Sequence, residues 1–136
     1  MDLSKIYAVI ADDDFMKALE IRKALEFNRI TDVDIVRDQG KLWERIYGNE
    51  QGMRQPNLIV TDMQYPLSAG ADIDKEAGLK LLEKMEKEQI DIPVIICSTG
   101  NYEKVPGALG TVWYTERRDI NLEFREVLRA LNTNVN

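Results

Sequence analysis

The sequence predicts an α/β fold in which helices cover both faces of a parallel sheet. Short apolar runs rich in β-branched residues alternate with segments in which apolar residues recur at helical spacing. Uninterrupted apolar runs are typical of strands buried on both faces, and regular strand–helix alternation is typical of right-handed βαβ units. With 136 residues, 44% of them hydrophobic, the chain is expected to form a single domain, residues 1–136.

Five strands are predicted from the apolar runs. They cover residues 6–11, 32–36, 58–61, 93–97 and 111–114. The expected arrangement is the flavodoxin-like three-layer αβα sandwich with a five-stranded parallel sheet in the order 2-1-3-4-5. This order would place the first, third and fourth strands side by side.

Four helices are predicted from apolar spacing. Their expected buried faces contain, in chain order, Phe15, Ala18, Leu19 and Leu25; Leu42, Trp43, Ile46 and Tyr47; Leu79, Leu82 and Met85; and Phe124, Val127, Leu128 and Leu131. Asp119 or Asn121 is the candidate N-cap of the last helix. Between Gly100 and Gly110 a proline and a further glycine disfavour a full helix, so the fourth helix of the alternating pattern is expected to be shortened or absent.

Composition excludes several classes of function. The net charge of −6 and pI near 4.8 argue against binding to nucleic acid or to an anionic membrane, and the N-terminus lacks the pattern of a signal peptide, so a cytoplasmic protein is expected. Histidine is absent, which removes histidine-based catalytic triads and imidazole-bound zinc. Cys97, the single cysteine, lies within an apolar run and is expected to be a buried small hydrophobe.

Three of the predicted strands end at side chains that carry oxygen. These are Asp12, Asp13 and Asp14 after the first strand, Asp62 after the third, and Ser98 and Thr99 after the fourth. Ligands of open parallel sheets bind beyond the carboxyl ends of the strands, so these groups are expected to converge. A group of carboxylates without histidine or cysteine suits Mg²⁺, and the pattern therefore indicates a metal-assisted phosphoryl site.

The same residues have simpler interpretations. The acidic triplet taken alone could equally cap the first helix, and Ser98 with Thr99 could equally form a turn through hydrogen bonds to their own backbone. Asp62 favours the metal interpretation, because a carboxylate directly after a buried strand needs a partner.

At these positions the chain resembles the receiver domain of two-component response regulators (CheY-like), in an atypical form. The family's motifs occur in their usual order, as the acidic pair Asp12-Asp13, the lone Asp62, Pro66 and the hydroxyl of Ser98. The resemblance implies that Asp62 is the phosphoacceptor. It further implies that Asp12, Asp13, Asp62 and the backbone carbonyl of Gln64 hold Mg²⁺, and that Ser98 or Thr99 contacts the phosphoryl group as a switch.

The resemblance implies a stand-alone regulator rather than an enzyme. Its expected partners are a histidine kinase or phosphotransfer protein, which would supply the phosphoryl group in a phosphorelay, and a downstream protein target. No nucleic acid or membrane partner is expected, and the chain is expected to be a monomer or weak homodimer. Two alternatives stay open: a pseudo-receiver that binds proteins without phosphorylation, and a small α/β enzyme or flavin-type nucleotide carrier that uses the same crevice.

Two further departures from the family pattern bear on the site. The lysine that the family places at the end of strand five is missing near Tyr114, and Arg117 and Arg118 are the candidate replacements. A polar insertion, Leu67 to Ala77, follows the proline after Asp62. An ordinary solvated loop is the favoured interpretation of the insertion, and a lid or specificity loop is the alternative.

Overall fold

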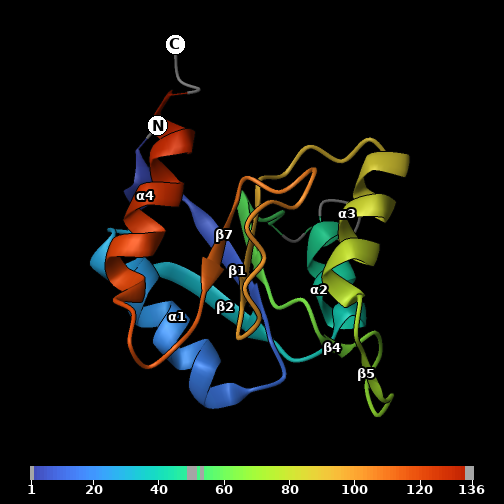
Figure 1. The fold of residues 1–136 in the computed structure, drawn as a ribbon. Coiled ribbons are helices and arrows are strands. Elements are labelled where there is room, and N and C mark those ends of the chain that lie inside the picture. Colours follow the sequence, from blue (N-terminus) through green and yellow to red (C-terminus); the bar gives the residue numbers. More distant parts are fainter. Residues whose placement is uncertain (1, 49–51, 53, 134–136) are drawn as a thin grey trace.

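The computed structural model of the chain describes residues 2–48, 52 and 54–133. Its main sheet contains five parallel strands in the order β2-β1-β3-β6-β7 (Figure 1). The strands are β1 (Tyr7–Ala11), β2 (Asp32–Val36), β3 (Leu58–Thr61), β6 (Val94–Ser98) and β7 (Gly110–Trp113). The predicted sheet and its strand order are confirmed.

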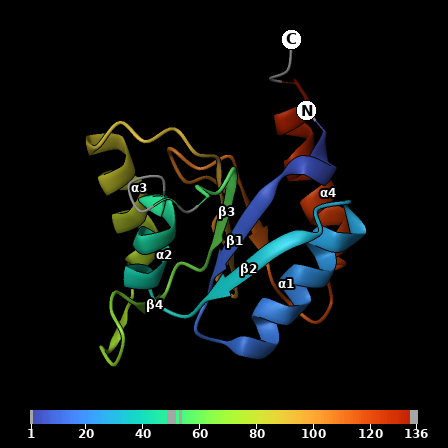
Figure 2. The same ribbon diagram turned by 180° about the vertical axis from the view of Figure 1, so that it is seen from behind.

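Helices cover both faces of the sheet (Figures 1 and 2). One face carries α1 (Phe15–Phe27) and α4 (Ile120–Thr133), and the other carries α2 (Gln39–Ile46) and α3 (Ala77–Lys87). A short 3-10 helix, Leu3–Lys5, precedes β1. The predicted three-layer sandwich is therefore confirmed. Within the described residues, no helix combines the length and apolar character needed to span a membrane.

The core has two parts, one on each face of the sheet. Alternate residues of β1 point to opposite faces: Ala8 and Ile10 belong to the cluster under α1 and α4, whereas Val9 and Ala11 belong to the cluster under α2 and α3. All five residues of β1 are buried. The strand therefore lies in the middle of the core, between its two parts.

Two predicted helix faces need correction. Phe15 is 51% exposed and Leu79 is also exposed, although both were expected in the core. Each lies in the first turn of its helix, and α1 begins beyond the carboxyl edge of the sheet (Figure 1). The buried residues of α1 are Lys17, Ala18, Ile21, Ala24 and Leu25, so the prediction is confirmed for Ala18 and Leu25. Asp119, one of the two candidate caps, does accept a hydrogen bond from the backbone N–H of Asn121, at 3.0 Å.

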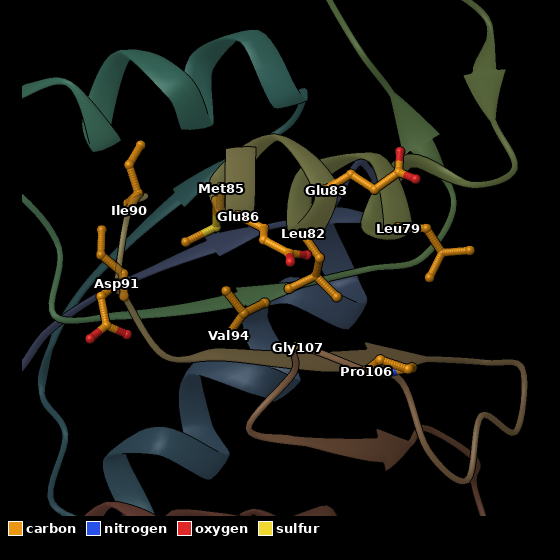
Figure 3. Close-up of a pocket in the computed structure, with 11 residues that line it drawn as sticks. Leu79, Leu82, Glu83, Met85, Glu86, Ile90, Asp91, Val94, Pro106 and Gly107 are labelled. Carbon is orange, nitrogen blue, oxygen red and sulfur yellow. The ribbon is translucent and has the colours of Figure 1, made fainter. Parts of the chain in front are cut away.

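The connection from β6 to β7, residues 99–109, contains no helix, as the sequence predicts. Gly107 has a φ of +90°, which a helix cannot accommodate. Because no helix forms here, a groove of about 620 Å³ lies between α3 and this connection (Figure 3). The groove is lined by Leu79, Leu82, Glu83, Met85, Glu86, Ile90, Asp91, Ile92, Val94, Pro106 and Gly107.

The insertion after Asp62 is more regular than the expected loop. Strands β4 (Tyr65–Pro66) and β5 (Ile73–Asp74) form an antiparallel hairpin at the same end of the sheet as the start of α1 (Figure 1). Tyr65 is buried, and its hydroxyl oxygen lies 2.8 Å from the Thr61 hydroxyl and 3.2 Å from the Gln39 side-chain nitrogen. These contacts join the base of the hairpin to β3 and α2.

Gly110 is expected to be the residue that permits α4 to pack against β7. A Cβ atom at this position would lie 2.6 Å from Cγ1 of Val127, which is shorter than any ordinary contact. Gly110→Ala should therefore lower the free energy of unfolding by about 1 to 3 kcal/mol, measured by urea denaturation.

The matched control is the double variant Gly110→Ala with Val127→Ala. Removing the valine methyl groups makes room for the new Cβ, so the alanine at position 110 should cost little in the Val127→Ala background. An equal cost in both backgrounds would show that this contact does not limit the packing of α4.

Candidate functional site

The candidate site lies at the carboxyl edge of the sheet, where β1 and β3 are neighbours. Asp12 directly follows β1, and Asp62 directly follows β3. The backbone N–H of Asp12 donates to the Val36 carbonyl at 3.0 Å, and that of Asp62 donates to the Ala11 carbonyl at 2.9 Å. Sheet hydrogen bonds thus extend one residue past each strand and fix the backbone of both aspartates.

Three carboxylates converge here as predicted. Asp12, Asp13 and Asp62 each offer an oxygen atom, and these atoms all lie within 4.8 Å of one another. Asp12 is 0% exposed, whereas Asp13 is partly exposed and the side chain of Asp62 is 13% exposed. The site is therefore buried on the side of Asp12 and open to solvent at the other two carboxylates.

The members of the acidic triplet have different roles. Asp14 is the N-cap of α1, and its side chain accepts a hydrogen bond from the backbone N–H of Lys17 at 3.2 Å. Asp12 points inward, with Oδ1 accepting from the backbone N–H of Asp14 at 2.9 Å. The capping interpretation thus holds for Asp14, and the site interpretation holds for the two residues before it.

A lysine that the sequence analysis did not consider lies in the middle of the site. Nζ of Lys17 is 2.8 Å from Oδ2 of Asp12 and 3.1 Å from Oδ2 of Asp62, and the lysine side chain is 2% exposed. It comes from the first turn of α1. The signal in the sequence is its spacing, because Lys17 belongs to the same i, i+1, i+4, i+7, i+8 stripe as the buried apolar residues of α1.

The geometry between Lys17 and Asp12 is that of an ion pair. Among the described residues, neither Nζ of Lys17 nor Oδ2 of Asp12 has a hydrogen-bond partner of suitable angle, and both atoms are fully buried. Oδ2 of Asp12 is thus a buried anionic oxygen whose charged neighbour is the Lys17 ammonium group, at 2.8 Å. Together with the carboxylates of Asp13 and Asp62, it gives an all-oxygen donor set that fits Mg²⁺.

Burial shifts the ionisation of both partners. Burial raises the pKa of Asp12 from 3.8 to about 6, against the lowering effect of Lys17 and with a further increase from Asp62. Burial also opposes the charge on Lys17, but the two carboxylates outweigh it and hold the pKa of Lys17 above its usual value of 10.5. The lysine is therefore cationic and the Asp12 carboxyl is anionic at neutral pH.

Among the described ion pairs, neither predicted arginine replacement is paired with a carboxylate of the site, and contact of either with a phosphoryl group stays a prediction. Arg118 donates to Glu123 at 2.8 Å, and its guanidinium lies over the ring of Trp113. Arg117 is exposed in the same turn before α4. Arg117 and Arg118 were predicted because they follow the last strand of the main sheet, β7, in sequence. The lysine that is paired with Asp12 and Asp62 is Lys17, which belongs to α1.

The Ser98 hydroxyl is engaged in a turn at the end of β6, and Thr99 is held through its backbone carbonyl. Ser98 is buried at the end of β6, and its Oγ accepts a hydrogen bond from the backbone N–H of Gly100 at 3.3 Å. The carbonyl of Thr99 accepts from the indole N–H of Trp113 at 3.0 Å. This is the turn geometry that the sequence allowed as an alternative. Contact of Ser98 or Thr99 with a phosphoryl group, and of the Gln64 carbonyl with a metal, stay predictions.

The loop after Asp62 is held by two backbone contacts. Met63 donates its backbone N–H to Oδ1 of Asp62 at 2.7 Å, and Gly78 donates to the Met63 carbonyl at 3.0 Å. A Cβ atom on Gly78 would lie 3.1 Å from the Asp62 carbonyl oxygen. A side chain at position 78 would push the start of α3 and the loop apart by a few tenths of an ångström, so Gly78 helps to set the position of Asp62.

Comparison with known proteins gives structural relatives only. No protein family model matches the sequence, and no curated protein is significantly similar to it. The signal receiver domain of a proposed LuxO repressor protein from Vibrio parahaemolyticus superposes with a TM-score of 0.69 and 16% identity, over 94% of this chain and 91% of that one. The fold is that of a response regulator receiver domain.

Two other receiver domains show the same likeness. The isolated receiver domain of RcsB from Salmonella enterica serovar Typhimurium gives a TM-score of 0.64 and 19% identity, over 94% of this chain and 88% of that one. The signal receiver domain of the proposed response regulator NarL from Mycobacterium tuberculosis gives 0.61 and 17%, over 92% and 97%. Another similar structure is an RcsB–DNA complex, in which this receiver fold spans 61% of the RcsB chain.

The raised pKa of Asp12 predicts a characteristic dependence of stability on pH. The folded state keeps the Asp12 proton up to about pH 6, whereas the unfolded state loses it near pH 4. Between these values the folded state binds more protons, so this carboxyl should lower the free energy of unfolding by roughly 2 to 3 kcal/mol as the pH rises.

Urea denaturation at about pH 4.5 and pH 7 tests this prediction, with Asp12→Asn as the comparison. The variant should lose less stability than the wild type over this interval. The lowered pKa values of Asp2, Asp32, Asp34 and Asp74 act only below about pH 4 and do not interfere. Identical pH dependence in wild type and variant would contradict the assignment to Asp12.

Proposed function

We propose that this chain is a receiver that accepts a phosphoryl group on Asp62 and transmits the signal through protein contacts. The observation that carries the proposal is the geometry around Asp62. Its carboxylate is partly exposed, lies beside two further carboxylates at the carboxyl edge of a receiver fold, and has a buried cation 3.1 Å away. These are the groups that transfer of a phosphoryl group to a carboxylate requires.

The reaction is a displacement at phosphorus. A carboxylate oxygen of Asp62 attacks the phosphorus atom, the bond between phosphorus and the leaving group breaks, and the leaving group keeps the electron pair. The product is an acyl phosphate. Because nucleophile and phosphoryl group are both anionic, the reaction needs cations at the site, and Lys17 supplies one of them.

Asp12, Asp13 and Asp62 would hold Mg²⁺, together with the Gln64 carbonyl that the family resemblance implies. When bound, Mg²⁺ neutralises negative charge on the phosphoryl oxygens. The protein's own groups perform the positioning. The backbone N–H of Met63 orients the Asp62 carboxylate, and Ser98 at the end of the neighbouring strand carries a hydroxyl that can turn from Gly100 to the phosphoryl group.

The expected partners follow from this chemistry. A histidine kinase or phosphotransfer protein would donate the phosphoryl group, and a separate protein would respond to the modified receiver. The chain would then act in a phosphorelay as a phosphoprotein rather than as an enzyme with a diffusible substrate. A cytoplasmic location and a monomer or weak homodimer are part of the same proposal, which involves neither nucleic acid nor membrane.

A second candidate is a module that binds its partner without phosphorylation. One observation favours it: Lys17 already contacts both Asp12 and Asp62, so the carboxylates have a counter-charge without metal or phosphate. In that case the arrangement of the site would be constant, and partner binding would not depend on Asp62.

Intact-mass spectrometry after incubation with acetyl phosphate, with and without Mg²⁺, separates the two candidates. The wild type should gain one phosphoryl group in the presence of Mg²⁺, and hydroxylamine should remove it, because acyl phosphates react with this nucleophile. Asp62→Asn should gain none. Asp72→Asn, which changes an exposed aspartate in the hairpin loop, is the matched control and should behave as the wild type. A folded wild type that gains no phosphoryl group would favour the phosphorylation-independent module.

A further inference from the structure

The charge balance at the site depends on one side chain. Three carboxylates gather at the edge of the sheet, and among the described ion pairs Lys17 is the cation that contacts two of them, Asp12 and Asp62. Its Nζ lies between Oδ2 of Asp12 and Oδ2 of Asp62. A fully buried ammonium group is costly unless it is paired with anions, so this position is a specific feature of the fold rather than a chance contact.

The Lys17 side chain reaches the space next to Tyr114, which directly follows β7. The family resemblance implies a lysine near Tyr114, and a tyrosine stands there instead. Nζ of Lys17 lies 5.9 Å from the centre of the Tyr114 ring, and the backbone N–H of Tyr114 donates to the Ser98 carbonyl at 2.8 Å. The ammonium group of α1 therefore lies between the acidic residues and the strand from which the cation was expected.

The local structure favours the inward direction of the Lys17 side chain. Asp14 caps the helix through the backbone N–H of Lys17, and the next residue, Ala18, is completely buried. The side chain is thus anchored at its backbone and covered by the core, with its ammonium group directed at the two carboxylates. A flexible surface lysine would make such a contact only part of the time.

We propose that Lys17 is the resident counter-ion of the receiver site, which occupies Asp12 in competition with Mg²⁺ and stabilises the phosphorylated form of Asp62. The second half rests on the function proposed above. Competition follows from position, because a divalent cation at Oδ2 of Asp12 would meet the ammonium group that lies 2.8 Å from the same atom. Mg²⁺ binding therefore requires that Nζ withdraw from Asp12 while it keeps its contact with Asp62.

This role differs from a purely structural ion pair in the direction of its effects. If Lys17 only held the fold together, a neutral substitution would weaken Mg²⁺ binding and phosphorylation alike. If it is a counter-ion, the same substitution frees Asp12 for the metal and removes a cation from the phosphoryl group. Mg²⁺ affinity should then rise while phosphorylation falls.

Isothermal titration calorimetry of the whole chain with Mg²⁺ tests the first effect. Lys17→Gln should bind Mg²⁺ more tightly than the wild type by about tenfold or more, because a competing charge has been removed. Lys17→Arg keeps the charge and should retain the weaker affinity. Lys23→Gln, which removes a lysine that is 72% exposed on the same helix, is the matched control and should bind as the wild type.

Phosphorylation by acetyl phosphate, at Mg²⁺ concentrations that saturate each variant, tests the second effect. Lys17→Gln should show a rate or a lifetime of the acyl phosphate that is reduced about ten- to a hundredfold, the expected effect of losing one charge-assisted hydrogen bond. Lys17→Arg should recover part of the loss, and Lys23→Gln should lose nothing.

The outcomes are distinguishable. Unchanged or weaker Mg²⁺ binding by a folded Lys17→Gln protein overturns the counter-ion role, as does unchanged phosphorylation. Circular dichroism with and without Mg²⁺ establishes folding. Should the glutamine variant not fold, Lys17→Met takes its place in the titration and in the phosphorylation assay. A wild type that accepts no phosphoryl group refutes the proposed function, but the calorimetric comparison still decides whether Lys17 competes for Asp12.

Discussion

The ion pairs of Lys17 with Asp12 and Asp62 are the interaction on which the structure of this end of the molecule depends. It joins the first turn of α1 to the residues that follow β1 and β3. Opposite charges at such short distance offset the cost of removing three ionised groups from water, at least in part. Loss of the lysine alone would leave two neighbouring carboxylates without a counter-charge. The position of α1 and the charge of the acidic residues therefore depend on each other.

Much of the fold and half of the site were predictable from the sequence because topology determines them. Once alternating strands and helices imply a parallel sheet, the residues after β1, β3 and β6 must meet at one edge. Asp12, Asp13 and Asp62 converge for this reason, without any contribution from their side chains. The absent helix between β6 and β7 was predictable from the local effects of proline and glycine.

The rest depended on three-dimensional contacts that no pattern records. A lysine within an apolar stripe is normally assumed to point to solvent, so Lys17 was not predicted as a site residue. Arg117 and Arg118 were predicted because they lie close in sequence to β7. Phe15 was assigned to the core because helical periodicity does not show where a helix extends beyond its sheet. The hairpin after Asp62 depends on Tyr65 and its distant partner Gln39, which belong to different elements.

The missing helix has an energetic consequence for any rearrangement near Ser98. In the described structure, the connection that follows Ser98 is joined to β6 by a backbone hydrogen bond from Leu109 to Val94, and a turn within it is closed by one from Ala108 to Val105. Segments without a regular ladder of such bonds open at lower free energy than packed helices. The first residues after β6 can therefore change conformation without unpacking a helix from the sheet, so the barrier to such local motion is set by a short loop.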